Sequence, residues 1–131
     1  MKAVAAFLAF GLASVAAFPS GGAERDYTDP DQLATLIAQK TEPYLLVDVR
    51  TPAEYESGHI PTSVNIPNTE IAARPPSVEK GALIIVYCRS GNRSATARKE
   101  LQAMGFTRVV DFGAVSKWKG QLVLGGEPGG K

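Results

Sequence analysis

The sequence predicts a single α/β domain in which helices cover both faces of a parallel sheet. Two apolar runs, at residues 44–49 and 83–87, are almost unbroken, which is typical of strands buried on both faces. A helical pattern at 94–104 separates the second run from a third, shorter run that begins at Val109. A strand, a helix and a strand at this spacing predict a right-handed βαβ unit.

The helices are predicted from their ends and their apolar spacing. A first helix is expected to begin at Asp29 and Pro30, because a capping residue followed by proline suits a first turn. Apolar side chains three and four residues apart then share one face of it: Leu33, Leu36 and Ile37. The helix at 94–104 repeats the pattern, and Gly105 is expected to end it. Its apolar face consists of Ala97, Leu101 and Met104.

Composition excludes several classes of protein. A chain of 131 residues with 44% hydrophobic residues is long enough for one core, and it is too short for an eight-fold barrel. The net charge of +1, without runs of like charge, argues against a nucleic-acid partner. One cysteine and one histidine allow no disulfide within the chain and no four-ligand zinc site. No dinucleotide fingerprint or serine-hydrolase elbow is present, so we expect neither a metal nor an organic cofactor.

Three further segments are expected around a domain at residues 26–119. Residues 1–17 are typical of a signal peptide, with a basic start, an apolar stretch and small residues before the cleavage site. The apolar stretch is shorter than the roughly 20 residues of a membrane-spanning helix, so we expect cleavage after Ala17, no stable membrane anchor, and a periplasmic or secreted protein. We expect residues 18–25 to be a flexible lead-in and residues 120–131 to be a mobile, glycine-rich C-terminal tail.

Cys88 is the strongest candidate for chemistry. It follows the predicted strand at 83–87, and ligands of open parallel sheets bind beyond the carboxyl ends of the strands. A tight turn into the next helix leaves backbone N–H groups free to bind an anion, and Gly91 permits such a turn. The helix dipole, Arg89 and Arg93 would lower the pKa of a thiol there, which makes Cys88 a nucleophile without a histidine base. The alternative is a small buried hydrophobic residue, as many free cysteines are.

Three blocks of sequence carry a resemblance to a known family. They are Asp48-Val49-Arg50 with Glu54-Tyr55 and Gly58-His59-Ile60-Pro61; the loop from Cys88 to Ser94; and Gly113-Ala114 with Trp118. In this order, over about residues 31–118, the chain resembles the rhodanese-like domains, especially the small secreted or periplasmic kind similar to thiosulfate sulfurtransferases. The resemblance implies a sheet of about five mainly parallel strands with helices on both faces. Thr62 and Ala114 depart from the family pattern, since glycine is common at both positions.

The resemblance also implies an activity. Members of the family move a sulfane sulfur from an anionic donor such as thiosulfate to a thiophilic acceptor, cyanide or a thiol, and carry it on a cysteine persulfide. Cys88 is then the catalytic residue, and the loop after it is substrate-binding: Arg89, Ser90, Gly91, Asn92 and Arg93. A protein is a further candidate acceptor.

Two alternatives keep the fold and change the role: a persulfide or sulfide carrier with little turnover of small molecules, and a protein-interaction module. A third is the cysteine phosphatases, whose loops keep five residues between cysteine and arginine. Here four residues separate Cys88 from Arg93, and the smaller ring of amides favours one sulfur atom over a phosphate.

Other polar residues are expected to be structural. Asp48 at a strand end is expected to order the neighbouring backbone. Glu54 pairs with Arg50 by resemblance, or it reaches back to the amide of Thr51 in a capping box. His59, the only histidine, is expected to be a satisfied, noncatalytic residue of a turn.

Overall fold

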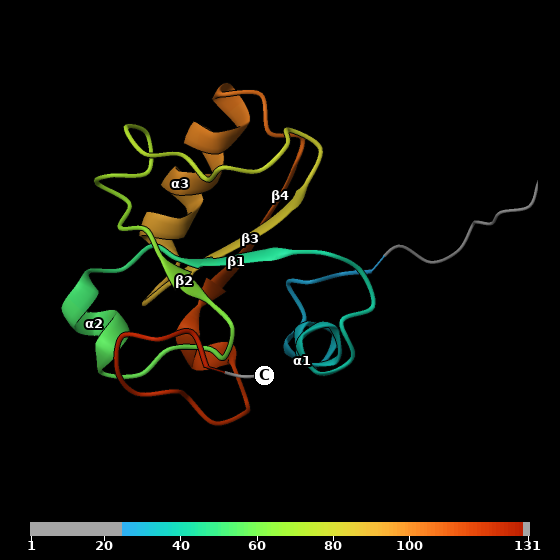
Figure 1. Ribbon diagram of the computed structural model, residues 1–131, viewed down its shortest axis with the longest axis vertical. Coiled ribbons are helices and arrows are strands. Elements are labelled where there is room, and N and C mark those ends of the chain that lie inside the picture. The colour runs from blue at the N-terminus through green and yellow to red at the C-terminus, as the bar shows by residue number, and fades with distance from the viewer. Residues whose placement is uncertain (1–24, 130–131) are drawn as a thin grey trace, which may run out of the picture.

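The computed structural model describes residues 25–129. In chain order the elements are α1 (Pro30–Gln39), β1 (Leu45–Asp48), α2 (Pro52–Glu56), β2 (Val64–Asn65), β3 (Leu83–Cys88), α3 (Asn92–Ala103), β4 (Arg108–Ala114) and the 3₁₀ turn η2 (Val115–Lys117). Figure 1 shows α1 and α3 on opposite sides of the sheet, with α2 directly after the carboxyl end of β1. The predicted α/β class is confirmed. The predicted signal peptide and most of the lead-in lie outside the described residues.

The sheet has the order β2-β1-β3-β4, and every pair is parallel. The described residues form four strands, one fewer than the resemblance implies. Before α1 the chain bends instead of extending, because Thr28 donates from its amide and its hydroxyl to the carboxylate of Asp26, and the Asp29 amide donates to the Asp26 carbonyl at 3.1 Å. This local turn competes with strand pairing.

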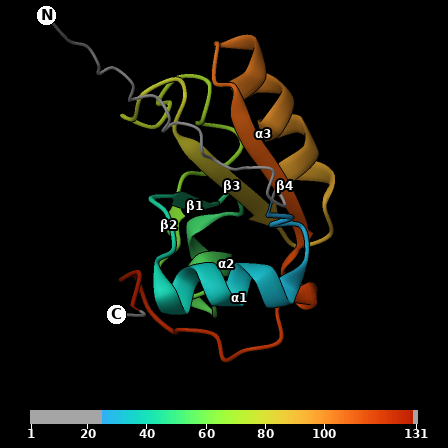
Figure 2. The same cartoon turned by 90° about the vertical axis from the view of Figure 1, so that its right-hand side faces the viewer.

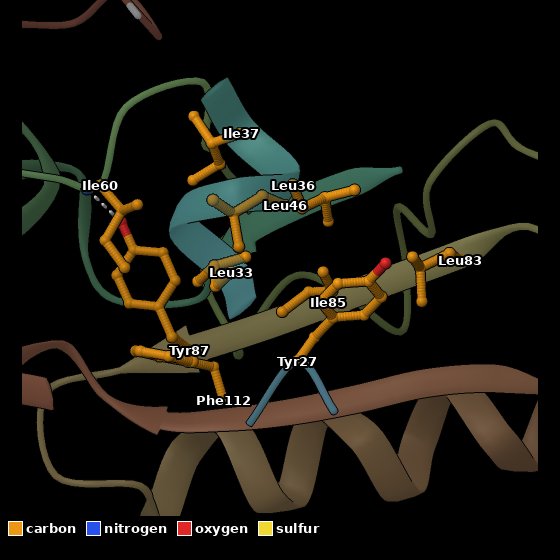
Figure 3. Close-up of a cluster of buried hydrophobic side chains, with 10 residues drawn as sticks. All are labelled: Tyr27, Leu33, Leu36, Ile37, Leu46, Ile60, Leu83, Ile85, Tyr87 and Phe112. Carbon is orange, nitrogen blue, oxygen red and sulfur yellow. Dashed lines mark hydrogen bonds between the residues drawn. The ribbon is translucent and has the colours of Figure 1, made fainter. Parts of the chain in front are cut away.

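Each face of the sheet has its own apolar cluster, because the side chains of β3 alternate between them. Leu83, Ile85 and Tyr87 join the cluster under α1, which Figure 3 shows together with Leu33, Leu36 and Phe112. The other side chains of β3, including Cys88, point to the cluster under α3, where Ala97 and Leu101 lie. Figure 2 shows α1 across one side of the sheet and α3 behind β4. The predicted face of α1 is confirmed, as are Ala97 and Leu101 on α3; Met104 is the C-cap residue after α3 and packs, partly buried, against the same cluster.

The helix ends follow local sequence rules. The side chain of Asp29 caps α1 by accepting from the Gln32 amide at 3.0 Å, and Pro30 occupies the first turn, as predicted. The helix predicted at 94–104 begins two residues earlier, at Asn92, because Gly91 takes the N-cap position with a φ of 104°. Gly105 follows it with a φ of 102°.

The C-terminal segment, residues 120–129, is bonded to the turn around His59. Val123 forms an antiparallel bridge with His59, with N–H···O distances of 2.8 and 2.9 Å. The Gly125 amide donates to the Glu56 carbonyl at 2.9 Å, and the Thr62 amide donates to the Pro128 carbonyl at 3.0 Å. The glycines suggested a mobile tail, but these backbone bonds hold the segment because the His59 turn offers it unpaired partners. In residues 25–129 no helix has both the length and the apolar character needed to cross a bilayer.

Candidate active site

Cys88 is the last residue of β3, and its side chain is buried beneath the first turn of α3. The strand pairs it with Ala114 of β4, just after an irregularity in which Phe112 is an extra residue on β4. Gly113 beside the irregularity has a φ of 95°, which favours glycine. The carboxyl ends of β3 and β4 therefore place the sulfur at the edge of the sheet where the sequence predicted a site.

The sulfur takes the place of a helix cap. Gly91, the N-cap residue of α3, has no side chain to accept from the first amides of the helix. The Gly91 amide donates to Cys88 Sγ at 3.0 Å, and the amide of Ser94, the third residue of α3, donates to it at 3.3 Å. The Cys88 thiol donates to Ser94 Oγ at 3.5 Å, and the Ser94 hydroxyl donates onward to the Gly91 carbonyl at 3.1 Å. The loop amides thus face inward onto the sulfur.

Two opposing effects set the pKa of the Cys88 thiol. Burial raises it, because the charged form loses hydration. Hydrogen bonds from the Ser94 hydroxyl and amide, and from the amides of Gly91 and Ser90, lower it. The hydrogen bonds prevail, so the pKa lies below its ordinary value, and at a given pH more of the side chain is thiolate than in an ordinary cysteine. The Ser94 hydroxyl and the oriented amides, more than the arginines, are therefore the source of the effect that the sequence predicted.

The other predicted site residues differ in their exposure. Arg89, Ser90 and Asn92 are exposed. Arg93 is partly buried and turns to α2, where its Nη1 and Nη2 lie 2.8 and 3.1 Å from Oε1 and Oε2 of Glu54. Of the five predicted binding residues, the backbone of Gly91 contacts the sulfur directly, and the Ser90 amide also acts on the thiol.

The expected ion pair between Arg50 and Glu54 is wrong. Arg50 is buried and pairs with Asp48, with Nη2 2.6 Å from Oδ2 and Nε 3.0 Å from both carboxylate oxygens. Glu54 pairs with Arg93 and also completes the capping box with Thr51, whose amide donates to it at 3.0 Å. Asp48 reaches Arg50 because the two residues are only two positions apart at the end of β1, whereas Arg93, the ion-pair partner of Glu54, lies 39 positions away.

His59 is part of a buried structural network. Its ring stacks on Tyr55 at 3.7 Å between centroids, and its two nitrogens lie 2.9 and 2.8 Å from the carbonyl oxygens of Tyr55 and Glu127. The Tyr87 hydroxyl accepts from the Ile60 amide at 3.0 Å, and burial raises the pKa of this phenol. These groups hold the turn after α2, and His59 has no contact with Cys88.

Sequence reasoning missed two functional candidates, Ser94 and Glu54. The sequence gives a signal for Ser94, because a serine in the first turn of a helix bends back to nearby backbone and side-chain groups. Nothing in the sequence ties Glu54 to Arg93. No three histidine, cysteine or acidic side chains gather as metal ligands would in the part of the chain that the structure describes.

The fold agrees with the comparisons to known proteins. Residues 29–121 match the model of the rhodanese-like domain, so the chain belongs to the rhodanese-like domain family. It is 38% identical over 91 residues to a protein named sulfurtransferase from Allochromatium vinosum, across 69% of this chain and 84% of the relative.

Two further matches agree. The chain is 34% identical to a thiosulfate sulfurtransferase of Escherichia coli, PspE, over 71 residues that make up 53% of this chain and 68% of the relative. A rhodanese-like domain protein from Staphylococcus aureus has a solved structure similar to this one, with a TM-score of 0.63 and 31% identity, over 72% of this chain and 93% of the other. These relatives place the chain among sulfurtransferase homologues, whose general activity is sulfur transfer.

Proposed function

We propose that the protein is a rhodanese-type sulfurtransferase that moves a sulfane sulfur from an anionic, thiosulfate-like donor to a thiophilic acceptor through a persulfide on Cys88. One observation carries the proposal: Cys88 Sγ is buried among inward-facing donors, the amides of Gly91 and Ser94, that stabilise negative charge on sulfur. The match to named sulfurtransferases supports it.

The first half-reaction loads the cysteine. The Cys88 thiolate attacks the outer sulfur of thiosulfate and forms a new S–S bond. The sulfur–sulfur bond of the donor breaks, and sulfite leaves with its electron pair. The product is a persulfide whose terminal sulfur carries the negative charge. Ser90 and Asn92 of the same loop are exposed, and the Ser90 amide is among the donors that lower the pKa of Cys88, so these residues are the candidates to contact that atom.

The second half-reaction returns the thiolate. An acceptor nucleophile, cyanide or a thiolate, attacks the terminal sulfur. The persulfide bond breaks, its electrons return to Cys88 Sγ, and thiocyanate or a new persulfide departs. The Ser94 hydroxyl can turn from the Gly91 carbonyl to the sulfur as charge returns, because a hydroxyl donates one proton to whichever acceptor is stronger.

Intact-protein mass spectrometry tests the persulfide. After incubation with thiosulfate, the protein is expected to gain one sulfur atom, and cyanide is expected to remove it as thiocyanate in repeated turnovers. Cys88→Ser, which keeps the size of the side chain, should gain none. A persulfide that forms without turnover on cyanide or thiols would indicate a carrier that serves a protein acceptor. Wild-type protein that gains no sulfur would contradict the proposal.

We also propose export as a periplasmic or secreted protein, with a domain organisation of signal peptide 1–17, lead-in 18–25, domain 26–119 and C-terminal tail 120–131. The support is the sequence pattern of the first 17 residues. N-terminal sequencing of the protein recovered from its producing cells should begin at Phe18. A protein that retains Met1 in the cytoplasmic fraction would contradict it.

A further inference from the structure

The two arginines of the Cys88 loop, residues 88–93, have different surroundings. Both ends of the Arg93 guanidinium bind the Glu54 carboxylate, at 2.8 and 3.1 Å. Arg89 is exposed, and its side chain makes no hydrogen bond or ion pair with the residues between 25 and 129. Arg89 therefore has a guanidinium free to meet a ligand, whereas the charge of Arg93 is already neutralised.

Glu54 is itself fixed before it meets Arg93. Its Oε1 accepts from the amide and the hydroxyl of Thr51 at 3.0 and 3.1 Å, and its own amide donates to Thr51 Oγ1 at 3.2 Å. The hydrogen bonds from Arg93 lower the pKa of Glu54 to about 2, so the carboxylate is ionised at neutral pH. The side chains of Arg93 and Glu54 are 31% and 27% exposed, which leaves the pair only partly screened by water.

The pair connects the segments that follow two neighbouring strands. Glu54 lies on α2, after β1, and Arg93 lies in the first turn of α3, after β3. Arg93 directly precedes Ser94, whose amide and hydroxyl contact Cys88 Sγ. The ion pair therefore holds the part of the backbone that supplies the donors to the sulfur.

We propose a division of labour between the two arginines: Arg89 attracts the anionic donor, and Glu54 is a positioning residue that engages Arg93 and holds the Cys88 loop against the sulfur. This inference rests on the proposed function and adds to it a residue outside the loop and a separate task for each arginine.

Alkylation of Cys88 by two reagents tests the division without sulfur transfer. Iodoacetamide is neutral and iodoacetate is anionic, so the ratio of their rates reports a cation at the mouth of the loop. Arg89→Gln is expected to lower the iodoacetate-to-iodoacetamide ratio about fivefold, the effect of roughly one charge pair in contact in water. Its rate with iodoacetamide should stay within about twofold of wild type, because Arg89 does not contact the sulfur.

The ion pair between Arg93 and Glu54 is expected to affect the iodoacetamide rate itself, because it holds the loop that contacts the sulfur. Glu54→Gln keeps the capping box, which accepts glutamine, but loses the ion pair. Glu54→Gln, Arg93→Gln and the double variant should lower the iodoacetamide rate by similar factors, since each breaks the same contact. The double variant has the same net charge as wild type, so it should keep the wild-type ratio of the iodoacetate and iodoacetamide rates.

Matched controls are Lys99→Gln, which removes an exposed cation of α3, and Glu70→Gln, which breaks the exposed pair with Arg74. Both should leave the rates and their ratio unchanged. The proposal is overturned by an unchanged iodoacetamide rate in Glu54→Gln, by additive losses in the double variant, or by an unchanged ratio in Arg89→Gln. If the alkylation results agree but the wild type takes no sulfur from thiosulfate, the proposed function fails, and with it the role of Arg89 toward a sulfur donor, whereas the positioning role of Glu54 stands.

Discussion

At the scale of single residues, the chemistry depends on a few backbone amides that a helix leaves unpaired. Cys88 Sγ accepts from the amides of Gly91 and Ser94, as a capping side chain would in another helix. The consequence is a thiol whose pKa lies below its ordinary value although the side chain is buried. The arrangement depends on Gly91, whose φ of 104° is disfavoured for any other residue.

Gly91→Ala should open the loop. A side chain at this φ costs about 1–2 kcal/mol, and the turn relaxes by moving its amides from the sulfur. We expect a lower free energy of unfolding by that amount and slower alkylation of Cys88 at neutral pH. Urea unfolding and the pH dependence of the iodoacetamide rate measure the two effects. Gly81→Ala is the control, because Gly81 has open space where a side chain would lie. Equal alkylation rates in wild type and Gly91→Ala would contradict the account.

Ser94→Ala should raise the pKa of the Cys88 thiol toward its ordinary value. The variant keeps the Ser94 amide and removes the hydroxyl, whose hydrogen bond is the largest of the effects that lower this pKa. The midpoint of the alkylation rate against pH is expected to move upward, and Ser94→Thr, which keeps a hydroxyl, should move it less. An unchanged midpoint in Ser94→Ala would leave the backbone amides as the sole cause.

At the scale of elements, the turn from Gly58 to Ser63 connects α2, β2 and the C-terminal segment. Thr62 has a φ of 72°, where the family pattern has glycine, so a β-branched residue is held in the left-handed region. Two hydrogen bonds hold it there: its amide donates to the Pro128 carbonyl at 3.0 Å, and its hydroxyl lies 2.9 Å from the Tyr44 hydroxyl. The C-terminal segment thus stabilises a turn that its own sequence disfavours.

Thr62→Asn should stabilise the protein. Asparagine tolerates the left-handed region better than a β-branched residue and keeps a polar side chain near Tyr44. We expect the free energy of unfolding to rise by about 0.5–1 kcal/mol. Thr62→Val keeps the shape and the strain but loses the hydroxyl, so its free energy of unfolding should be about 0.5–1.5 kcal/mol lower than that of wild type. Urea denaturation of the three proteins is the measurement, and a loss of stability in Thr62→Asn would show that the turn is not strained.

At the scale of the whole molecule, a buried ion pair lies at the carboxyl end of β1, the strand next to the one that carries Cys88. Asp48 and Arg50 form the pair at the end of β1, and Arg50 also donates to the Gly58 carbonyl at 2.7 Å. Asp48→Asn would leave a buried guanidinium without its anion. We expect a loss of about 3–5 kcal/mol, measured by thermal or urea unfolding, because an uncompensated buried charge is strongly destabilising. Glu70→Gln, which breaks an exposed pair, should change the stability little.

The global stability should also depend on the ionisation of Cys88. Since the pKa of this thiol is lower in the folded state, the unfolded chain binds more protons between the two pKa values, and stability rises with pH. The stability that the ionised Cys88 thiol contributes is complete above the ordinary thiol pKa of about 8.5, and it is lost as the pH falls through the pKa of Cys88 in the folded state. The stability of wild type relative to Cys88→Ser should therefore increase from neutral to mildly alkaline pH in reducing buffer. A difference that stays constant with pH would contradict the lowered pKa.

Local pattern predicted most of the fold and the position of the nucleophile. Apolar runs indicated β1 and β3, because a strand covered on both faces needs apolar side chains throughout. Asp29 and Pro30 indicated the start of α1, and Gly91 indicated a turn of unusual backbone conformation after Cys88. These features depend on residues that are neighbours in the chain, so the sequence alone determined them.

Contacts between distant segments were decided only by the tertiary structure. Of its two candidate partners nearby, Glu54 bonds the Thr51 amide and not Arg50. Its ion pair is with Arg93, 39 residues away, because the segments after β1 and β3 converge at one edge of the sheet. His59 likewise meets Glu127 across 68 residues. The spacing of residues in the sequence does not indicate which loops the sheet brings together. The packing of the whole domain therefore decided the ion-pair partners, and with them the different surroundings of Arg89 and Arg93.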